Sequence, residues 1–343
     1  MATRKKTSKP KKSTAERAMD ALAPIVEALE RGDSKVWRQP WNPSLGQVGS
    51  ADNLYRGINQ FSTSLVAAER GYKSRRWWTF DRIMQEGGAE RKTIKFPNGG
   101  KKVVWSGGDY SVAGTKGKWI TIVHVEWKAI TEEDAESGEE SVKFYKPYIR
   151  FHSVLNLDEV TGMPDEVKYP DHLHPEPSDV EPVAAYWDMI EGWQDAPKVN
   201  HRGDRAFYSP KADSITLPKT EQFVSGEAEA KVHAHESVHA TGHKSRLNRP
   251  GVANVTKFGD EQYAYEELVA ESGAAALCGA VGITSAEEAE NSAAYCQSWL
   301  KALNDDPVKF MQALNQGTAA AFYILGIDNP AEKDAAKKEK VAA

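Results

Sequence analysis

The spacing of apolar residues divides the chain into a first part with strand signals and a second part that is mostly helical. Over residues 14–30, apolar residues recur every three or four positions, which predicts a helix that stops near Gly32. A second helix is predicted over 62–70. Partial alternation of Val, Ile and Trp with polar residues over 94–127 indicates hairpins, and another strand is expected over 143–155.

Beyond residue 182 the pattern becomes helical. Helices are predicted over 183–193, 226–241, 263–280, 291–304 and 307–325, with one short strand over 214–217. Five prolines in residues 161–182 indicate a linker between the two parts. We therefore expect an α+β protein of two domains.

The predicted domain boundaries follow from these patterns. We expect a disordered basic arm over 1–13, an N-terminal domain of helices and β-hairpins over 14–160, a Pro-rich linker over 161–182, a mostly helical C-terminal domain over 183–327 and a flexible tail over 328–343. The arm is assigned as disordered because its first twelve residues carry six basic side chains and no acid.

Charge is divided unevenly between the two parts. Residues 1–128 hold 24 Lys or Arg against 12 Asp or Glu, whereas the remaining residues hold 20 against 37. Seven of the ten tryptophans also lie in the basic part. Cations that follow phosphates, together with aromatic faces on which bases stack, are typical of proteins that bind single strands. The N-terminal domain is therefore predicted to bind single-stranded nucleic acid, although about half of these tryptophans are expected in the core.

Three clusters of basic, aromatic and amide residues are the candidates for this contact with nucleic acid. The predicted contact residues are Trp37, Arg38, Trp41, Tyr55, Arg56, Asn59, Tyr72, Lys73, Arg75, Arg76, Trp77 and Trp78. Four further lysines, Lys92, Lys95, Lys101 and Lys102, flank a predicted hairpin turn at 97–100.

Other compartments and chemistries are disfavoured. No run of about 18 apolar residues is present, so no membrane-spanning helix is predicted. The basic start lacks the apolar stretch of a secretory signal. With only Cys278 and Cys296, a disulfide framework is not expected, which favours a reducing, cytoplasmic setting.

The strongest chemical signal is the sequence His235-Glu-Ser-Val-His239 inside a predicted helix. Residues four apart lie on one helical face, so both imidazoles can bind one metal ion, with Glu236 beside them as general base. A catalytic zinc site needs two such nitrogens, a third protein ligand and an open position for water. One Zn²⁺, or another divalent transition metal, is expected per chain.

The third ligand is sought downstream. Ser245 occupies the position where a metzincin would have its last histidine, and His243 lies at the end of the predicted helix. By analogy with zinc peptidases that have a glutamate ligand, we assign Glu267 to the metal and Glu271 to a hydrogen bond that orients a ligand histidine. The reverse assignment, and Glu266 as the ligand, stay open.

Further candidates are less specific. Tyr208, His243, Tyr263 and Tyr265 are considered as stabilisers of an oxyanion. The strand over 214–217 is either an ordinary edge strand or a strand that pairs with an extended peptide at the rim of a cleft. The remaining histidines considered, His172, His174, His201 and His233, are expected at the surface or in loops.

The order of these features resembles one family, the ArdC-type antirestriction proteins of plasmids and phages, which include the TraC-like DNA primases. The segments that carry the resemblance are Trp37–Asn42, Tyr55–Asn59, Gly71–Ser74, Trp78–Phe80, the strand near 148–156, Phe207–Pro210, Asp213–Pro218, His235–His239, Thr241–His243, Ser245–Leu247 and Glu266–Glu271. The resemblance implies a domain that binds single-stranded DNA without sequence preference, followed by a zincin-like metallopeptidase domain. It places His235, His239 and Glu267 on the metal and Glu236 on the general base.

Three functions are compatible with this sequence. The first is an antirestriction protein that binds single-stranded DNA and protects an incoming plasmid or phage genome from host restriction. The second is an active zinc endopeptidase that acts on a component of host restriction, with the basic domain only for localisation. The third is a single-strand shield whose metal is structural.

Overall fold

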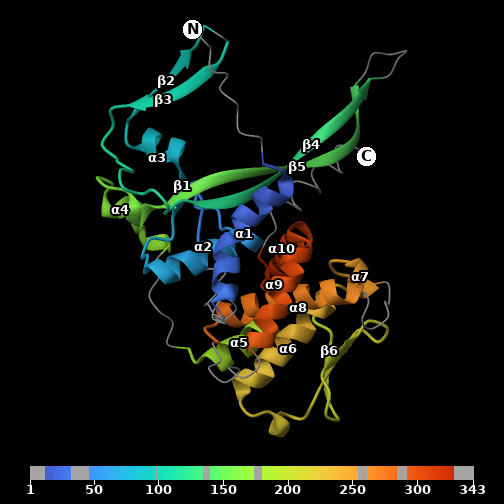
Figure 1. The fold of residues 1–343 in the computed structure, drawn as a ribbon. Coiled ribbons are helices and arrows are strands. Elements are labelled where there is room, and N and C mark those ends of the chain that lie inside the picture. Colours follow the sequence, from blue (N-terminus) through green and yellow to red (C-terminus); the bar gives the residue numbers. More distant parts are fainter. Residues whose placement is uncertain are drawn as a thin grey trace.

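The computed structural model describes residues 12–31, 46–97, 99–133, 140–173, 180–253, 261–283 and 292–327 (Figure 1). The elements, in chain order, are α1 (Thr14–Glu30), α2 (Gly57–Arg70), β1 (Trp77–Thr79), α3 (Phe80–Glu86), β2 (Glu90–Lys95), β3 (Lys101–Ser106), β4 (Ile120–Glu133), β5 (Glu140–Asn156), α4 (Asp165–Lys168), α5 (Pro182–Glu191), β6 (Lys198–His201), β7 (Phe207–Ser209), β8 (Ser214–Leu217), α6 (Gly226–Thr241), α7 (Pro250–Ala253), α8 (Glu261–Ala280), α9 (Ser292–Asp305) and α10 (Pro307–Ile324). The predicted α+β class is confirmed.

The N-terminal part is built on an antiparallel sheet with the strand order β1-β5-β4. The helices α1 and α2 lie against this sheet, and α2 contributes Val66 and Ala67 to a cluster with Trp77 and Val154. The strands β2 and β3 form a separate two-stranded ribbon, which projects from the body beyond α3 (Figure 1). All six residues of β2 are exposed.

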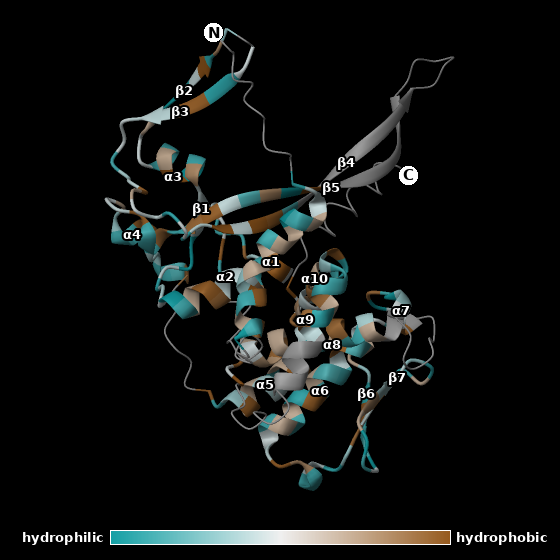
Figure 2. Cartoon of the chain, in the orientation of Figure 1, coloured by the Kyte–Doolittle hydropathy of each residue, from teal (hydrophilic) through white to brown (hydrophobic). Residues whose placement is uncertain are grey.

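The two parts of the chain share one hydrophobic core. Leu22 and Ile25 of α1 and Phe61 of α2 pack in the same buried cluster as Trp299 of α9 and Leu314 of α10. Apolar residues gather where these helices face one another (Figure 2). The N-terminal helices are therefore packed directly on the C-terminal helices, rather than joined to them by a tether alone.

The C-terminal part combines helices α6, α8 and α10 with a small sheet in the order β6-β8-β7. The strand predicted over 214–217 is β8, and it pairs with β6 in parallel and with β7 in antiparallel orientation. Both of its edges are thus occupied, which corrects the expectation that this strand is an edge or accepts a peptide. The edge strands of this sheet are β6 and β7.

Two glycines allow α8 to approach its neighbours closely. A Cβ placed on Gly273 would lie 2.7 Å from a methyl carbon of Val238 in α6 and 2.9 Å from the carbonyl oxygen of Gly317 in α10. Since Val238 stands between His235 and His239 in the sequence, this contact sets the distance between α8 and the histidine pair.

The segment over 161–173 packs against the N-terminal sheet. Val160 and Met163 are buried beside Trp78, and Ser74 donates a hydrogen bond to the carbonyl of Lys168 at 2.8 Å. Residues 174–179 of the predicted linker, the arm up to residue 11 and the tail from residue 328 lie outside the described residues. None of the helices within the described ranges is both long and apolar enough to span a bilayer.

Several elements follow the sequence pattern closely, and others do not. The helices over 14–30 and 226–241 match α1 and α6, whereas α2 begins at Gly57, five residues before the predicted start. The first turn of α2 is held by a distant contact, because the Ile58 N–H donates to Asn315 Oδ1 of α10 at 3.1 Å. Apolar spacing cannot reveal such a contact. The short elements β1, α3, β6 and β7 were not predicted.

Candidate metal centre

The helix α6 places the two histidines of the motif side by side. Its N-terminus is fixed by Ser225, whose hydroxyl accepts a hydrogen bond from the Ala228 N–H at 3.2 Å. One turn separates His235 from His239, and their Nε2 atoms lie 3.1 Å apart. Two imidazole nitrogens that converge at this distance can share a single ion.

The helix α8 brings a carboxylate to the same point. Glu267 Oε2 lies 3.5 Å from His235 Nε2, and Glu267 Oε1 lies 3.5 Å from His239 Nε2. Donor atoms of His235, His239 and Glu267 all lie within 4.8 Å of one another, and they form the one such group found among the described residues. The three residues predicted as ligands are thus brought together.

The outer nitrogen of each imidazole also faces a carboxylate. His235 Nδ1 lies 3.5 Å from Glu271 Oε1, and His239 Nδ1 lies 3.5 Å from Glu266 Oε1. An N–H directed at a carboxylate fixes the tautomer that leaves Nε2 free for a metal. Glu271 lies where the sequence analysis expects it, while the position of Glu266 behind His239 favours Glu267 over Glu266 as the third ligand.

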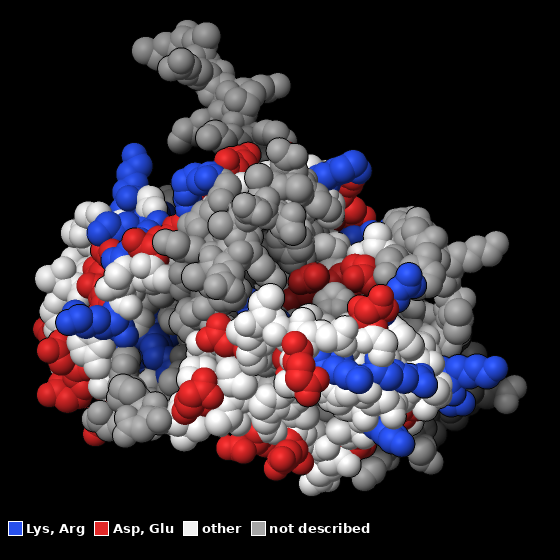
Figure 3. All heavy atoms as spheres, turned by 90° about the horizontal axis from the view of Figure 1, so that it is seen from below, with Lys and Arg blue, Asp and Glu red and all other residues white. Residues whose placement is uncertain are grey.

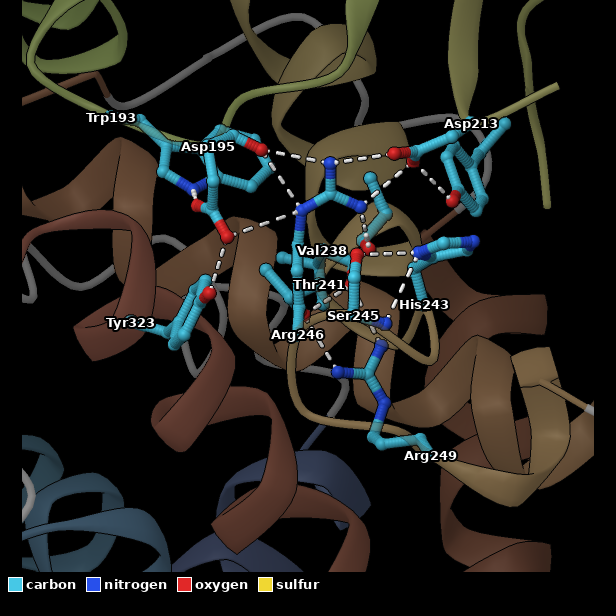
Figure 4. A network of polar contacts seen from close by, with 12 residues as sticks. Trp193, Asp195, Asp213, Val238, Thr241, His243, Ser245, Arg246, Arg249 and Tyr323 are labelled. Carbon is cyan, nitrogen blue, oxygen red and sulfur yellow. Dashed lines mark hydrogen bonds and ion pairs between the residues drawn. The ribbon is translucent and has the colours of Figure 1, made fainter.

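Arg249 holds Glu266 in this position. Its side chain and that of Glu266 are each 5% exposed, and Arg249 Nη2 lies 2.5 Å from Glu266 Oε1. Arg249 also donates to Thr241 Oγ1 at 2.6 Å and to the Val238 carbonyl at 2.7 Å, so that it ties α8 to the end of α6 (Figure 4). Arg249 was not predicted from the sequence, because it follows α6 in a segment without a periodic pattern.

Glu236 lies beside the histidines and is 8% exposed. Burial raises the pKa of its carboxyl group, against the opposing effect of His239 and His235. The carboxylate accepts a hydrogen bond from the backbone N–H of Tyr208, which places strand β7 next to the site. A carboxyl group with a raised pKa next to a metal site is suited to accept and return a proton.

Negative charge dominates the site electrostatically. Burial by itself would raise the pKa of Glu267, but hydrogen bonds and charges of the two histidines outweigh it, and the pKa is lowered. Burial disfavours a charge on His239, yet Glu266 and Glu267 raise its pKa to about 9. Carboxylates that favour a proton on an imidazole favour a divalent cation there as well. Two imidazoles and one carboxylate are the donor set of a transition metal, and these residues fit such an ion.

A second buried cation, Arg246, follows α6 and lies in a network of polar contacts (Figure 4). Arg246 pairs with Asp213 at 2.8 Å, and its guanidinium lies 5.6 Å from the ring centre of Trp193. The Tyr208 hydroxyl donates to Asp213 at 2.7 Å. The hydroxyl of Tyr208, one of the four candidates for stabilising an oxyanion, is therefore already hydrogen-bonded. His243 is another candidate, and its Nδ1 lies 2.7 Å from Ser245 Oγ. Arg246 was not singled out from the sequence, although it lies within the Ser245–Leu247 segment.

His233 differs from expectation. It is 1% exposed rather than at the surface, and its Nδ1 lies 2.8 Å from the hydroxyl of Tyr186 in α5. Burial lowers the pKa of His233 to about 4, so the imidazole is neutral. It faces the core of the C-terminal part because two residues along a helix turn the side chain away from the face of His235.

Three of the predicted DNA contacts have to be corrected. Trp77, Trp78 and Arg75 are 0%, 4% and 8% exposed. Trp77 Nε1 donates to Gln47 at 2.7 Å, and Arg75 Nε donates to the carbonyl of Gly46 at 3.1 Å. Side chains buried in this way cannot stack on a base or meet a phosphate, so these three residues build the N-terminal core.

Five other predicted contacts are half-buried, and their side chains contact the protein. Tyr55 donates a hydrogen bond to the carbonyl of Trp77, and Tyr72 donates one to Glu159. Arg76 pairs with Asp52, and Arg56 lies over the ring of Phe322. Asn59 hydrogen-bonds both the N–H and the carbonyl of Val123. Lys73 is exposed. Trp37, Arg38 and Trp41 lie outside the described residues.

Comparison with known families defines the class of protein. The model of the N-terminal domain of anti-restriction factor ArdC matches residues 15–151. The model of the zincin-like metallopeptidases matches residues 193–316, which include the histidine pair and Glu267. The chain thus joins an ArdC-type N-terminal domain to a zincin-like domain.

Whole-chain comparisons agree with this class. Two proteins of Escherichia coli named DNA primase TraC are each 29% identical over 89% of this chain, which spans only 19% and 26% of their lengths. Crystal structures of the antirestriction protein ArdC from plasmid R388 match 90% of the chain in the metal-free form (TM-score 0.58, 29% identity, 96% of that chain) and 92% in the Mn(II)-bound form (TM-score 0.60, 28% identity, 98% of that chain). The chain is thus similar over most of its length to the antirestriction protein ArdC, and it has an ArdC-type N-terminal domain followed by a zincin-like domain.

Proposed function

We propose that this protein is an antirestriction factor that binds single-stranded DNA through its N-terminal part and holds one divalent transition metal at His235, His239 and Glu267. In this role it protects an incoming plasmid or phage genome from host restriction. The match to the ArdC N-terminal domain and the excess of basic residues before residue 128 support the first half. The Mn(II)-bound structure of R388 ArdC supports the second.

One observation carries the proposal for the metal centre. Three donor atoms from two helices converge within 4.8 Å, while the outer nitrogen of each histidine faces a separate carboxylate. The arrangement confines two imidazoles beside three carboxylates. It is not expected for surface histidines that do not bind a metal. We assign Glu271 and Glu266 to the orientation of His235 and His239.

The residues around this centre support hydrolytic chemistry. A divalent metal there would act as a Lewis acid and lower the pKa of a water molecule. Glu236 is placed to take up a proton and to deliver it to a leaving group, because burial raises the pKa of its carboxyl group. The Tyr208 N–H keeps this carboxylate oriented from strand β7.

The test compares the wild-type protein with Glu236→Gln in a restriction-protection assay during DNA transfer. Glutamine keeps the shape of the side chain but cannot accept a proton. Loss of protection with unchanged metal content and unchanged DNA affinity would show that protection requires hydrolysis. Full protection by Glu236→Gln supports the alternative in which the protein shields single strands and the metal has a structural role.

A working endopeptidase is the second candidate function. The edge strand β7 lies next to Glu236, and an extended peptide can pair with an exposed strand edge beside a catalytic carboxylate. Incubation of the metal-loaded protein with purified components of a host restriction system tests this function. Cleavage by the wild type but not by Glu236→Gln would support it, and intact substrates under conditions that give full protection would exclude it.

A further inference from the structure

The β2–β3 ribbon is anchored at its base and exposed along its length. Trp105 Nε1 donates to Asp81 of α3 at 2.9 Å, and the Asp109 N–H donates to the Gly87 carbonyl at 2.8 Å. From this base the two strands run in register from Glu90 opposite Ser106 to Lys95 opposite Lys101. All six residues of β2 are exposed, so no other described element covers this strand.

Positive charge is concentrated on this ribbon. It carries Arg91, Lys92, Lys95, Lys101 and Lys102 against one acid, Glu90, which pairs with Lys92 at 2.6 Å. On the underside of the molecule, by contrast, basic and acidic side chains are interspersed (Figure 3). The ribbon is therefore a local cationic surface on a chain whose net charge is -5.

The arrangement of two lysines is unfavourable in the free protein. Lys95 and Lys101 are directly opposite each other in the register of the two strands. Like charges in this position destabilise a β pair, and a two-stranded hairpin is only marginally stable in water. An anion located between the two ammonium groups would remove this repulsion. A negatively charged partner would therefore stabilise the ribbon.

Apolar side chains accompany these cations. Ile94 and Phe96 are each 45% exposed and Val103 is 38% exposed, which makes three of the seven exposed large hydrophobic side chains of the described residues. Apolar and polar residues are mixed along both strands (Figure 2). Phe96 stands at the turn, where its carbonyl accepts from the Gly99 N–H at 3.0 Å and Gly99 has a φ of 79° that favours glycine.

We infer that the β2–β3 ribbon is the main surface on which the N-terminal part binds single-stranded DNA. Phosphates of the strand lie against Lys95, Lys101 and Lys102, and an unpaired base stacks on the exposed ring of Phe96. This inference rests on the proposed function and gives it a location. It also explains how the domain binds a strand when Trp77 and Trp78 are buried in its core.

The chemistry of the ribbon favours a single strand over other polyanions. A single strand presents phosphates and free base faces together, and proteins bind it with cations and aromatic rings in combination. A paired duplex presents its phosphates, but its bases are stacked on each other and offer no face to Phe96. The apolar side chains at the tip therefore match a single strand best.

The test uses the full chain and an oligonucleotide without secondary structure. The triple variant Lys95→Gln, Lys101→Gln, Lys102→Gln is expected to reduce the slope of log affinity against log salt by about 2, since each phosphate contact to a single strand contributes about 0.7. Phe96→Ala is expected to weaken binding about 5- to 150-fold, with an unchanged salt slope. A matched triple variant on the C-terminal part, Lys198→Gln, Lys211→Gln, Lys219→Gln, should leave the slope unchanged.

The outcomes separate this inference from the proposed function. If the wild-type chain does not bind single strands at all, the proposed function fails. If the wild type binds single strands and the ribbon variants bind them with equal affinity, only the ribbon assignment fails. The same holds if the triple lysine variant weakens binding to duplex DNA as much as binding to single strands. Thermal unfolding provides the folding control: removal of the Lys95 and Lys101 repulsion should leave the Tm unchanged or higher, so a lower Tm together with lost affinity would count against the inference.

Discussion

Arg249 and Glu266 form a buried ion pair, and the Glu266 carboxylate also faces His239 of the metal centre. Arg249 Nη2 lies 2.5 Å from Glu266 Oε1, and the same oxygen lies 3.5 Å from His239 Nδ1. Both charged side chains are 5% exposed. The pair therefore links the orientation of His239 to the segment that follows α6.

Glu266→Gln is expected to lower both stability and metal affinity. The substitution leaves the guanidinium of Arg249 buried without its counter-charge, which costs about 3 to 5 kcal/mol of unfolding free energy. Loss of the carboxylate behind His239 should weaken metal binding about 10- to 100-fold. Chemical denaturation and a metal titration measure the two effects.

An exposed ion pair provides the control for Glu266. Lys301 and Asp305 lie 2.7 Å apart with side chains 78% and 63% exposed. Asp305→Asn should leave both quantities unchanged. A Glu266→Gln variant with native stability and native metal affinity would contradict the positioning role.

Replacement of any single ligand should abolish stoichiometric metal binding. We expect less than one metal per chain for His235→Ala, His239→Ala and Glu267→Ala, because each of them leaves only two protein donors. His201→Ala, at a histidine whose side chain is 40% exposed, should retain the metal. Elemental analysis of purified proteins checks the content.

Metal removal should lower the thermal stability of the wild type. A ligand that binds only the folded state raises the unfolding free energy, by about 2.7 kcal/mol at a free concentration of 100 times Kd. A chelator should therefore lower the Tm of the wild type and leave the Tm of His239→Ala unchanged. Equal Tm shifts in the two proteins would show that the chelator acts elsewhere.

Gly273→Ala is expected to push α8 away from α6. The added methyl would meet Val238 at 2.7 Å and the carbonyl of Gly317 at 2.9 Å, so neither neighbour can be avoided. Overpacking of this kind costs about 1 to 3 kcal/mol. Because Glu267 lies on the same helix, metal affinity should fall together with stability.

A less crowded glycine is the control. The methyl of Gly192→Ala would lie 3.3 Å from its nearest neighbour, and a smaller loss of stability with native metal affinity is expected. If Gly273→Ala keeps native metal affinity, α8 is not held at the histidines by this contact.

Leu22→Ala should destabilise both parts of the chain together. Leu22 is fully buried in the cluster that α1 shares with α9 and α10, and truncation of a buried leucine costs about 2 to 5 kcal/mol. Denaturation followed by circular dichroism and by metal release should give one common transition, shifted to lower denaturant. Val224→Ala, at a side chain 85% exposed, is the control. Separate transitions would show that the two parts unfold independently.

Much of the helical framework could be predicted, because amphipathic spacing and stop signals are local. The boundaries of α1, α6 and β8 follow from such signals. Elements held by distant contacts could not be predicted in this way. The start of α2 depends on Asn315, and the pairing of β8 with two neighbours depends on strands that are three and four residues long.

The metal centre was accessible from sequence because its ligands are spaced by helical turns. His235 and His239, like Glu267 and Glu271, are four residues apart and share a helical face. Arg249 has no such spacing and acts through Glu266. In the basic part, burial could not be predicted from composition. Trp77 and Trp78 lie among basic residues, as in a DNA-binding cluster, and only the packing of the folded chain shows that they are interior.

The core shared by α1, α9 and α10 also constrains how the protein is made. Leu22 finds its partners Phe310 and Leu314 almost three hundred residues later in the chain. During synthesis, the first helix leaves the ribosome long before the last one exists, and contacts so distant in sequence form slowly. The part of the α1 surface that meets α9 and α10 therefore lacks its native partners until translation has passed α10, although α2 can pack on α1 much earlier.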